Sequence, residues 1–212
     1  MSESPDVLTP AWITRLESEL AREGTEPVSL HHIIEHVIHR LRYRQVDPFV
    51  TRCETMADLG CGQHYRFLKS HHDKAERCWG LDVTVADGED GNITLRKWDI
   101  TCHLPFERET IDQITILAVL EHIPNPRALL SEYHRVMTSG GRIIITTPSK
   151  LGIKIHDIMR GLRLVRDVEE GEHVDFSMSG SALTSWAEGA GFRVEVSRQF
   201  EMGLNLLLVG RK

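Results

Sequence analysis

Met56-Ala57-Asp58-Leu59-Gly60-Cys61-Gly62 is the stretch that decides the fold of this 212-residue chain. The run 54–59 is short and mostly apolar, which is typical of a buried strand, and a helical pattern follows over 63–70. The two glycines allow a tight turn and let the backbone approach a ligand without a Cβ clash. A strand that ends in a glycine turn and opens a helix predicts the first unit of a parallel α/β sheet. In such sheets, ligands bind at the carboxyl ends of the strands.

Short apolar runs alternate with helical patterns along the rest of the chain. We expect strands at 54–59, 77–82, 93–98, 111–117, 142–147, 192–198 and 203–209, and helices near 63–70, 126–138 and 179–189. Strands separated by helices need crossover connections, so the predicted sheet is mainly parallel and has helices on both faces. Only a few residues around Phe200-Glu201-Met202 join the last two strands. Such a link permits an antiparallel hairpin and excludes a parallel crossover.

Two helical patterns precede the predicted sheet. Residues 10–22 and 28–44 carry apolar residues at helical spacing, Gly24 separates the two runs, and Asp47-Pro48 ends the second. We therefore expect an N-terminal helical cap over residues 1–50. A single compact domain follows over 51–212, with a lid-like insertion near 149–178.

The composition limits the class of protein. Hydrophobic residues make up 41% and charged residues 26%, the balance of an ordinary globular protein. No stretch approaches the roughly 18 apolar residues that a membrane span needs, and the acidic start lacks the features of a signal peptide. Four single cysteines indicate reduced thiols, and a formal charge of −6 disfavours binding to nucleic acid. We expect a cytoplasmic protein with no membrane span and no nucleic-acid partner.

Acidic residues close three successive predicted strands. Asp58 lies at the end of the first strand, Asp82 at the end of the second and Asp99 at the end of the third. Because parallel strands end at the same edge of a sheet, we expect these acids to lie close together. Asp82 follows the glycine turn at the distance from which an acid accepts hydrogen bonds from ribose hydroxyls. Asp99 is placed to accept from an adenine amino group. Three acids beside a glycine turn indicate a nucleotide-like ligand.

The glycine turn also indicates which nucleotide-like ligand fits. A pyrophosphate-binding fingerprint needs G-x-G-x-x-G, and Tyr65 occupies the place of its third glycine. The charge of Asp58 would repel a pyrophosphate and attract an ammonium group. A ligand with adenine, ribose and an amino acid but no phosphate is S-adenosylmethionine.

The glycine turn resembles motif I of the class I S-adenosylmethionine-dependent methyltransferases, and further matches follow in the order typical of that family. They are Leu104-Pro105-Phe106, Ile111-Asp112, the run LAVLEHIPNP at 117–126, the run EYHRVMTSGG at 132–141, and Ala190-Gly191-Phe192. The resemblance extends from about residue 51 to about residue 210. Within the family, the chain resembles the methyltransferase type 11 group and is distantly similar to ubiquinone-pathway O-methyltransferases. It implies a Rossmann-like sheet of seven strands in the order 3-2-1-4-5-7-6, with strand 7 antiparallel.

The resemblance also assigns each matching residue to a part of the cofactor. The residues are Asp58, Gly60, Cys61 and Gly62 for the methionine part; Asp82 for the ribose; Val83, Asp99 and Ile100 for the adenine; and Leu117 for the sulfonium region. His64 stands where many members carry a third glycine. The implied product of the cofactor is S-adenosyl-L-homocysteine.

Histidines and arginines near the predicted site are candidates for acting on the methyl acceptor. His122 follows the fourth strand and His173 follows the fifth, and an acceptor that is protonated at neutral pH needs a general base. Arg42 and Arg163 lie in two basic stretches and would pair with a phosphate or carboxylate of an anionic acceptor. A structural hydrogen bond for His122 and a solvated helix face for the arginines are the alternatives.

Two histidine patterns resemble metal sites, but neither predicts a metal. Glu121-His122 resembles the E-x-x-E-H segment of ubiquinone-pathway O-methyltransferases, yet Ala118 replaces the first acid. The run HIIEH at 32–36 matches the inverzincin pattern H-x-x-E-H, but no suitable helix supplies the third protein ligand of a catalytic zinc. We expect no metal ion.

The sequence therefore predicts a methyltransferase that uses S-adenosylmethionine and methylates a small-molecule acceptor at an oxygen atom. One alternative is a nicotinamide-dependent oxidoreductase on a similar sheet, which Tyr65 and the charge of Asp58 disfavour. The other is a non-catalytic binding protein with the methyltransferase fold, which the acids at three strand ends disfavour. The sequence contains no signal of oligomeric state.

Overall fold

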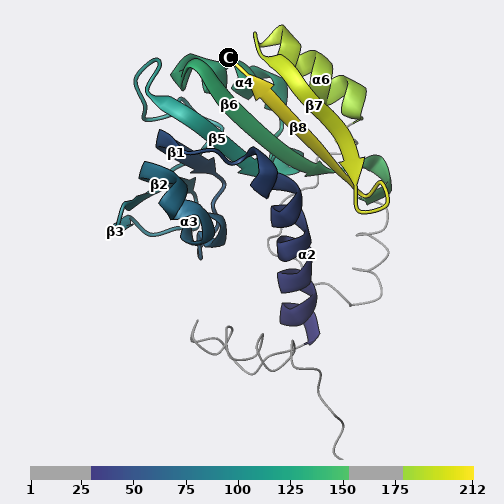
Figure 1. Cartoon of the computed structure of the whole chain (residues 1–212), viewed down its shortest axis with the longest axis horizontal. Helices are drawn as coiled ribbons and strands as arrows, with labels where there is room; N and C mark the ends of the chain where they lie inside the picture. The colour runs from purple at the N-terminus through teal and green to yellow at the C-terminus, as the bar shows by residue number, and fades with distance from the viewer. Residues whose placement is uncertain (1–29, 153–178) are drawn as a thin grey trace, which may run out of the picture.

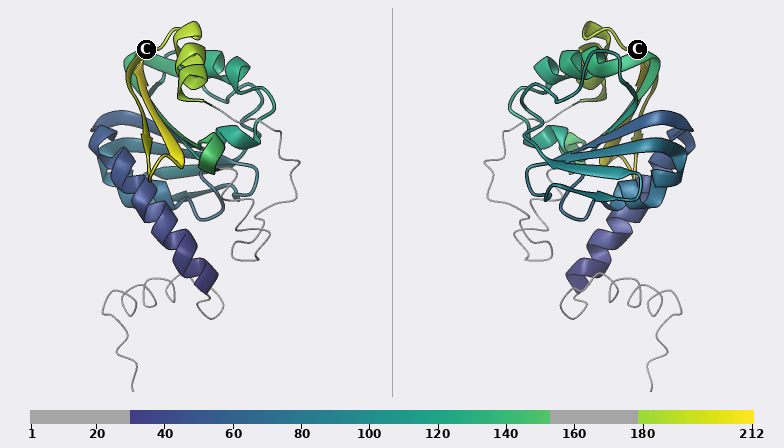
Figure 2. Two further views of the ribbon diagram at one scale, coloured as in Figure 1. Left: turned by 90° about the vertical axis from the view of Figure 1, so that its right-hand side faces the viewer. Right: turned by 90° about the vertical axis from the view of Figure 1, so that its left-hand side faces the viewer.

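The computed structural model describes residues 30–152 and 179–212, which form one mixed sheet with helices on both faces (Figures 1 and 2). The strands are β1 (Cys53–Leu59), β2 (Ala75–Asp82), β3 (Gly88–Asp90), β4 (Ile93–Lys97), β5 (Ile111–Leu117), β6 (Met137–Pro148), β7 (Arg193–Phe200) and β8 (Asn205–Arg211). The helices are α2 (Leu30–Val46), α3 (Arg66–His71), α4 (Pro126–Val136) and α6 (Gly180–Gly189), with short 3-10 turns η1 (Asp47–Phe49), η2 (His72–Lys74) and η3 (Leu120–His122). The predicted α/β class is confirmed.

The sheet has the order β3-β4-β2-β1-β5-β6-β8-β7. Parallel pairing joins β4, β2, β1, β5 and β6, and β8 is antiparallel to both β6 and β7. The predicted count of seven strands is wrong, because Gly88–Asp90 adds an eighth strand at the edge and so changes the order. Without β3, the remaining strands follow 3-2-1-4-5-7-6 when renumbered along the chain. β3 pairs antiparallel with β4 through a turn at Gly91, whose φ is +61°.

Two layers of apolar side chains cover the sheet, one on each face. On the α4 face, Leu59 and Ile145 pack with residues of α4 and α6. On the α2 face, Met56 and Ile144 pack with residues of α2 and α3. Figure 2 shows α2 on one side of the sheet and α4 and α6 on the other. Because side chains alternate along a strand, Asp58 follows Met56 on the α2 face.

The predicted N-terminal cap and insertion fall only partly within the described residues. The second predicted helix corresponds to α2, which leads through η1 into β1. The first predicted helix, at 10–22, lies outside the described residues, as does most of the insertion near 149–178. Across 30–152 and 179–212, no helix is long and apolar enough to span a membrane.

Candidate cofactor-binding site

The loop after β1 has a shape that only glycine allows at its first turn. Gly60 has φ +80°, and a Cβ on it would lie 2.4 Å from Cγ2 of Val119. The amide of Gly60 donates to the carbonyl oxygen of Leu81 in β2 at 2.8 Å, so the loop is fixed to the next strand. Gly62 has φ +69°, and no described atom lies within 4 Å of the position that its Cβ would take. At Gly60 the loop therefore packs closely against Val119, which follows β5, whereas at Gly62 the described residues leave free space beside it.

Asp82, at the end of β2, is held by three hydrogen bonds before any ligand binds. Gly62 N donates to Oδ2 at 2.8 Å, and the amide and hydroxyl of Thr84 donate to Oδ1 at 2.8 and 2.6 Å. These bonds fix the plane of the carboxylate and tie it to the glycine loop. A carboxylate has about four lone-pair sites, so Oδ2 keeps capacity to accept from a ribose hydroxyl.

Asp58 is a buried carboxylate, with 3% of its surface exposed. Its Oδ1 accepts a hydrogen bond from the hydroxyl of Thr115 in β5 at 2.6 Å. Burial raises the pKa of Asp58 to about 7; the Thr115 hydrogen bond opposes this rise and nearby Asp82 adds to it. No ion pair to Asp58 forms within residues 30–152 and 179–212. An ammonium group of a ligand would supply the missing positive charge.

Asp99 follows β4 at the same edge of the sheet. Trp98 N donates to the carbonyl oxygen of Asp82 at 3.0 Å, so the ends of β2 and β4 are neighbours. Oδ1 of Asp99 accepts from the hydroxyl and amide of Thr101, at 2.6 and 2.9 Å, and these bonds hold the pKa of the carboxyl below its usual value. Its Oδ2 faces the thiol of Cys102 at 3.7 Å. The carboxylate is thus ionised and fixed by its own loop.

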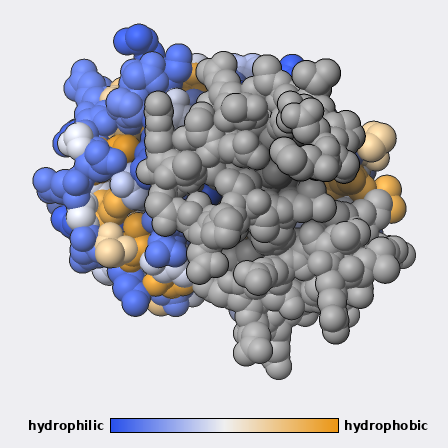
Figure 3. Space-filling model, turned by 90° about the horizontal axis from the view of Figure 1, so that it is seen from below, coloured by the Kyte–Doolittle hydropathy of each residue, from blue (hydrophilic) through white to orange (hydrophobic). Residues whose placement is uncertain are grey.

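The predicted adenine contacts differ in exposure. Val83 is 49% exposed, whereas Ile100 is 8% exposed and packs in the core of the α4 face. The side chain of Ile100 therefore serves packing. Seen from below, the left side of the surface shows hydrophobic residues in small patches between hydrophilic ones (Figure 3). An exposed apolar side chain such as Val83 is suited to the flat face of an adenine ring.

Cys61 lies between the two glycines, but its thiol is not reactive. Burial raises the pKa of the thiol, and the carboxylates of Asp58 and Asp82 raise it further. The thiol therefore stays protonated at neutral pH. Its sulfur would lie 3.0 Å from a Cβ on Gly80 of β2, so Cys61 fills the space next to that strand.

The end of β5 leads into a strained turn. Leu117 is the last residue of β5, and Ala118 has φ +58°, a conformation that costs energy for a residue with a Cβ. Ala118 N donates to Thr146 O in β6 at 2.9 Å. In the following turn η3, His122 is exposed and Glu121 accepts a hydrogen bond from Thr147 Oγ1 at 3.1 Å. Glu121 is therefore near the carboxyl ends of β5 and β6, and His122 is the next residue along the chain.

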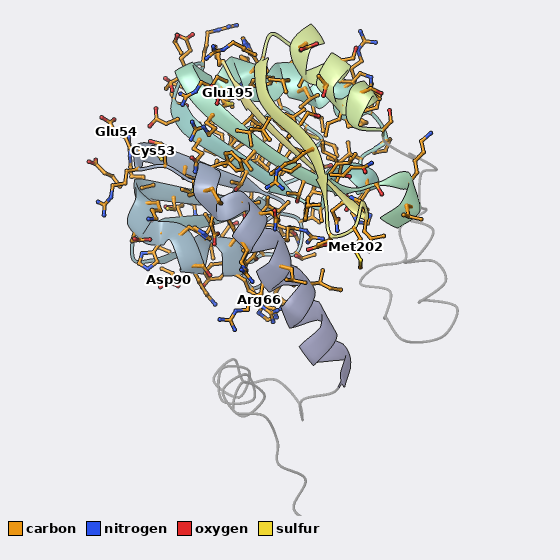
Figure 4. The ribbon with its side chains drawn as sticks, turned by 45° about the vertical axis from the view of Figure 1, so that its right-hand side comes forward. Cys53, Glu54, Arg66, Asp90, Glu195 and Met202 are labelled. Atoms are coloured by element: carbon orange, nitrogen blue, oxygen red, sulfur yellow. The ribbon has the colours of Figure 1, made fainter. Side chains whose placement is uncertain are left out.

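Helix α2 places Tyr43 near the buried carboxylate of Asp58. Burial and the charge of Asp58 raise the pKa of Tyr43 above its usual range, and Arg42 and Arg66 oppose this rise. All three charged groups are therefore close enough to Tyr43 to change the pKa of its phenol. Figure 4 shows Arg66, at the start of α3, beside α2. Within the described residues, the buried Nε of Arg42 has no hydrogen-bond partner.

The structure brings together the predicted residues on the ends of β1, β2, β4 and β5. It also shows Thr84 and Thr115, which the sequence analysis did not select, and Glu121, which the sequence analysis considered only as part of a metal-like pattern. Predicted His173 and Arg163 lie outside the described residues. Within the described ranges no three His, Cys, Asp or Glu side chains lie close enough to hold a metal ion, so the absence of a metal stays a prediction.

These residues fit S-adenosylmethionine. Asp58 offers a buried negative charge for the ammonium group, Asp82 an oriented carboxylate for the ribose, and Val83 an apolar surface for the adenine. The carboxylates of Asp58 and Asp82 would repel a pyrophosphate. A cavity of about 300 Å³ between α4 and α6, lined by residues such as Arg127 and Trp186, shares no residue with this site.

Comparison with known proteins agrees with this fit. Residues 29–196 match the sequence model of the family described as "Methyltransferase domain". The ubiquinone biosynthesis O-methyltransferase of Coxiella burnetii is 23% identical over 189 residues, which cover 84% of this chain and 80% of the relative. The tRNA U34 carboxymethyltransferase of Aliarcobacter butzleri is 27% identical over 174 residues, covering 72% of this chain and 52% of the relative.

Solved structures share the fold at low sequence identity. An S-adenosylmethionine-dependent methyltransferase from Mesorhizobium loti has a TM-score of 0.66 and 16% identity, with 81% of this chain and 98% of that chain covered. A methyltransferase from Aquifex aeolicus has a TM-score of 0.58 and 15% identity, with 96% and 98% covered.

Proposed function

This chain belongs to the class I S-adenosylmethionine-dependent methyltransferase family, and we propose that it transfers the methyl group to an oxygen atom of a small-molecule acceptor. The oxidoreductase and non-catalytic interpretations are set aside, because the family match covers most of the chain. The observation that carries the oxygen assignment is the similarity, over 84% of this chain, to an enzyme named a ubiquinone biosynthesis O-methyltransferase.

The residues at the strand ends divide the binding of the cofactor among them. Asp58 would take the ammonium group, the Gly60–Gly62 loop would lie along the methionine part, and Asp82 would take the ribose. When bound, S-adenosylmethionine supplies a methyl group on a positively charged sulfur. The sulfur is the leaving group of an in-line displacement at this methyl carbon. Leu117 would line the sulfonium region, and the protein's main contribution is to orient the acceptor toward it.

His122 is our candidate for the base that removes the acceptor's proton. The role is supported by its position in η3, which follows β5, since Leu117 at the end of β5 is predicted to line the sulfonium region. A hydroxyl acceptor needs a base at neutral pH. Replacing His122 with alanine should lower the rate of methyl transfer by about 10²-fold or more, with little change in affinity for S-adenosylhomocysteine. His72→Ala, which removes an exposed histidine of η2, is the control. An unchanged rate of label transfer in His122→Ala would exclude this role.

Arg42 is our candidate for pairing with an anionic acceptor. Its Nε is buried without a hydrogen-bond partner in the described residues, so a carboxylate or phosphate would satisfy it. Replacing Arg42 with alanine should weaken acceptor binding about tenfold and leave affinity for S-adenosylhomocysteine unchanged. Arg44→Ala, on the exposed side of α2, is the matched control. Weaker binding of S-adenosylhomocysteine would instead assign Arg42 to the carboxylate of the cofactor.

Labelled-methyl transfer from S-adenosylmethionine into a cell extract tests the acceptor class. The extract is divided into small molecules, RNA and protein, and the labelled product is identified by mass spectrometry. We expect label in the small-molecule fraction, on oxygen. Because one relative is named a tRNA carboxymethyltransferase, label in the RNA fraction is the outcome that would overturn the proposal.

A further inference from the structure

Thr115 and Asp58 face each other across two neighbouring strands. Asp58 of β1 and Thr115 of β5 are direct partners in the parallel register. Thr115 has no exposed surface and Asp58 is 3% exposed, and their side chains are joined by the 2.6 Å hydrogen bond from Oγ1 to Oδ1. A hydroxyl fixed this closely by two central strands has little freedom to turn away.

The groups around Asp58 do not themselves favour its negative charge. Asp82 of β2 adds a like charge, and Cys61 of the loop and Cys78 of β2 are buried thiols that its field affects. Tyr43 of α2 is near enough to Asp58 for the charge of Asp58 to raise the pKa of its phenol, and Arg42 and Arg66 act on the same phenol in the opposite direction. Burial disfavours a carboxylate that lacks a close cation. The hydroxyl of Thr115 is a donor that favours the ionised form.

We propose that Thr115 is a positioning residue for the cofactor: its hydroxyl fixes Oδ1 of Asp58 and favours the ionised form of the carboxylate, so that Oδ2 receives the cofactor's ammonium group. The proposal rests on the proposed role of Asp58 in binding that group. Thr115 itself has no exposed surface, so it would act on the ligand only through Asp58.

This arrangement makes binding depend on pH in a defined direction. Because burial raises the pKa of Asp58 to about 7, the carboxyl group takes up a proton as the pH falls through neutrality, and affinity for an ammonium ligand falls with it. Removing the Thr115 hydroxyl takes away a hydrogen bond that lowers this pKa. In a Thr115→Val variant, the loss of affinity should therefore begin at a higher pH than in the wild type.

Two ligands separate this role from a general structural one. S-adenosylhomocysteine carries the ammonium group, and 5′-methylthioadenosine has the same adenosine and sulfur but no amino acid. Affinities are measured by calorimetry between about pH 6 and pH 8.5 for the wild type, Thr115→Val and Thr115→Ser. If the pKa of Asp58 rises by about one unit in Thr115→Val, the affinity of this variant for S-adenosylhomocysteine should be roughly fivefold below that of the wild type at pH 7. At pH 8.5 the two affinities should differ little. Thr115→Ser keeps a hydroxyl and should restore the wild-type profile.

Affinity for 5′-methylthioadenosine should be the same in all three proteins at every pH. An equal loss for both ligands would mean that Thr115 only supports the fold of the loop, and no loss for either would exclude a role. Asp58→Asn tests the assumption beneath the proposal. If Asp58→Asn still prefers S-adenosylhomocysteine over 5′-methylthioadenosine as the wild type does, the assignment of Asp58 fails. If Asp58→Asn loses this preference and Thr115→Val does not, only the role of Thr115 fails.

Discussion

Asp82→Asn should bind S-adenosylhomocysteine about 100-fold more weakly than the wild-type protein. The carboxylate is oriented by Gly62 and Thr84, so its remaining lone pairs would accept from a ribose hydroxyl without reorganisation. An asparagine turns one acceptor oxygen into a donor, which would face either the amide of Gly62 or the hydroxyl of Thr84. Hydrogen bonds to a charged group contribute about 1.5–3 kcal/mol each, so the loss of one or two accounts for a 100-fold change. Calorimetry with S-adenosylhomocysteine measures it.

Asp87→Asn is the matched control for this prediction. Asp87 lies in the same loop, and its Oδ1 accepts from Lys97 N at 2.6 Å, which an asparagine oxygen can also do. We expect wild-type affinity in Asp87→Asn and a melting temperature within a few degrees of the wild type in both variants. If Asp82→Asn and Asp87→Asn bind equally well, Asp82 has no part in the ribose site.

The sequence predicts those parts of the site that depend on local order along the chain. Asp58, Gly60 and Asp82 follow from the pattern of strand, turn and strand end, because each of them is marked by its neighbours in sequence. Thr115 and Thr84 carry no such mark. Thr115 is 57 positions from Asp58, and only the register of β1 against β5 makes them partners. A single threonine within an apolar strand does not reveal which residue it faces.

The sequence patterns did not predict strand β3, for a related reason. Its three residues, Gly88–Asp90, contain no apolar side chain and so give no alternation. The strand exists because the turn at Gly91 folds it back onto β4. The last hairpin was predictable, since the few residues between β7 and β8 exclude a parallel crossover. The turn of this hairpin covers residues 201–204 and carries Met202, which is 94% exposed and lies at the end of the sheet (Figure 4).

Glu132→Ala should have the largest effect on stability of the replacements considered, about 3–5 kcal/mol in the free energy of unfolding. Arg135 Nε donates to Oε2 of Glu132 at 2.7 Å and its Nη2 donates to Oε1 at 2.8 Å, while both side chains are at least 80% covered. Leu104 N also donates to Oε1, at 2.8 Å. The variant leaves Nε of Arg135 and this amide without their acceptor. A melting temperature lower by about 10 °C is the expected result.

The pH dependence of this loss has a definite sign. Burial raises the pKa of Glu132, but the hydrogen bonds from Arg135 and Leu104 outweigh it and hold the pKa below its usual value. A depressed pKa in the folded state means that the stabilisation is complete above the unfolded pKa and is lost as the pH falls through the folded one. The difference between wild type and Glu132→Ala should therefore be constant near neutral pH and shrink below about pH 4.5. Glu188→Ala, on the exposed surface of α6, should leave the melting temperature unchanged.

Arg135→Lys separates the geometry of this pair from its charge. Nη2 of Arg135 also donates to Phe106 O at 2.9 Å, so one planar guanidinium ties α4 to the segment that begins with Asp99. A lysine keeps the charge but cannot bind a carboxylate through two parallel bonds and reach the carbonyl as well. We expect Arg135→Lys to lower the free energy of unfolding by about half as much as Glu132→Ala does. If the lysine variant unfolds at the wild-type temperature, the positive charge at position 135 is enough to stabilise the segment that carries Asp99. The hydrogen bonds of the guanidinium would then make no separate contribution.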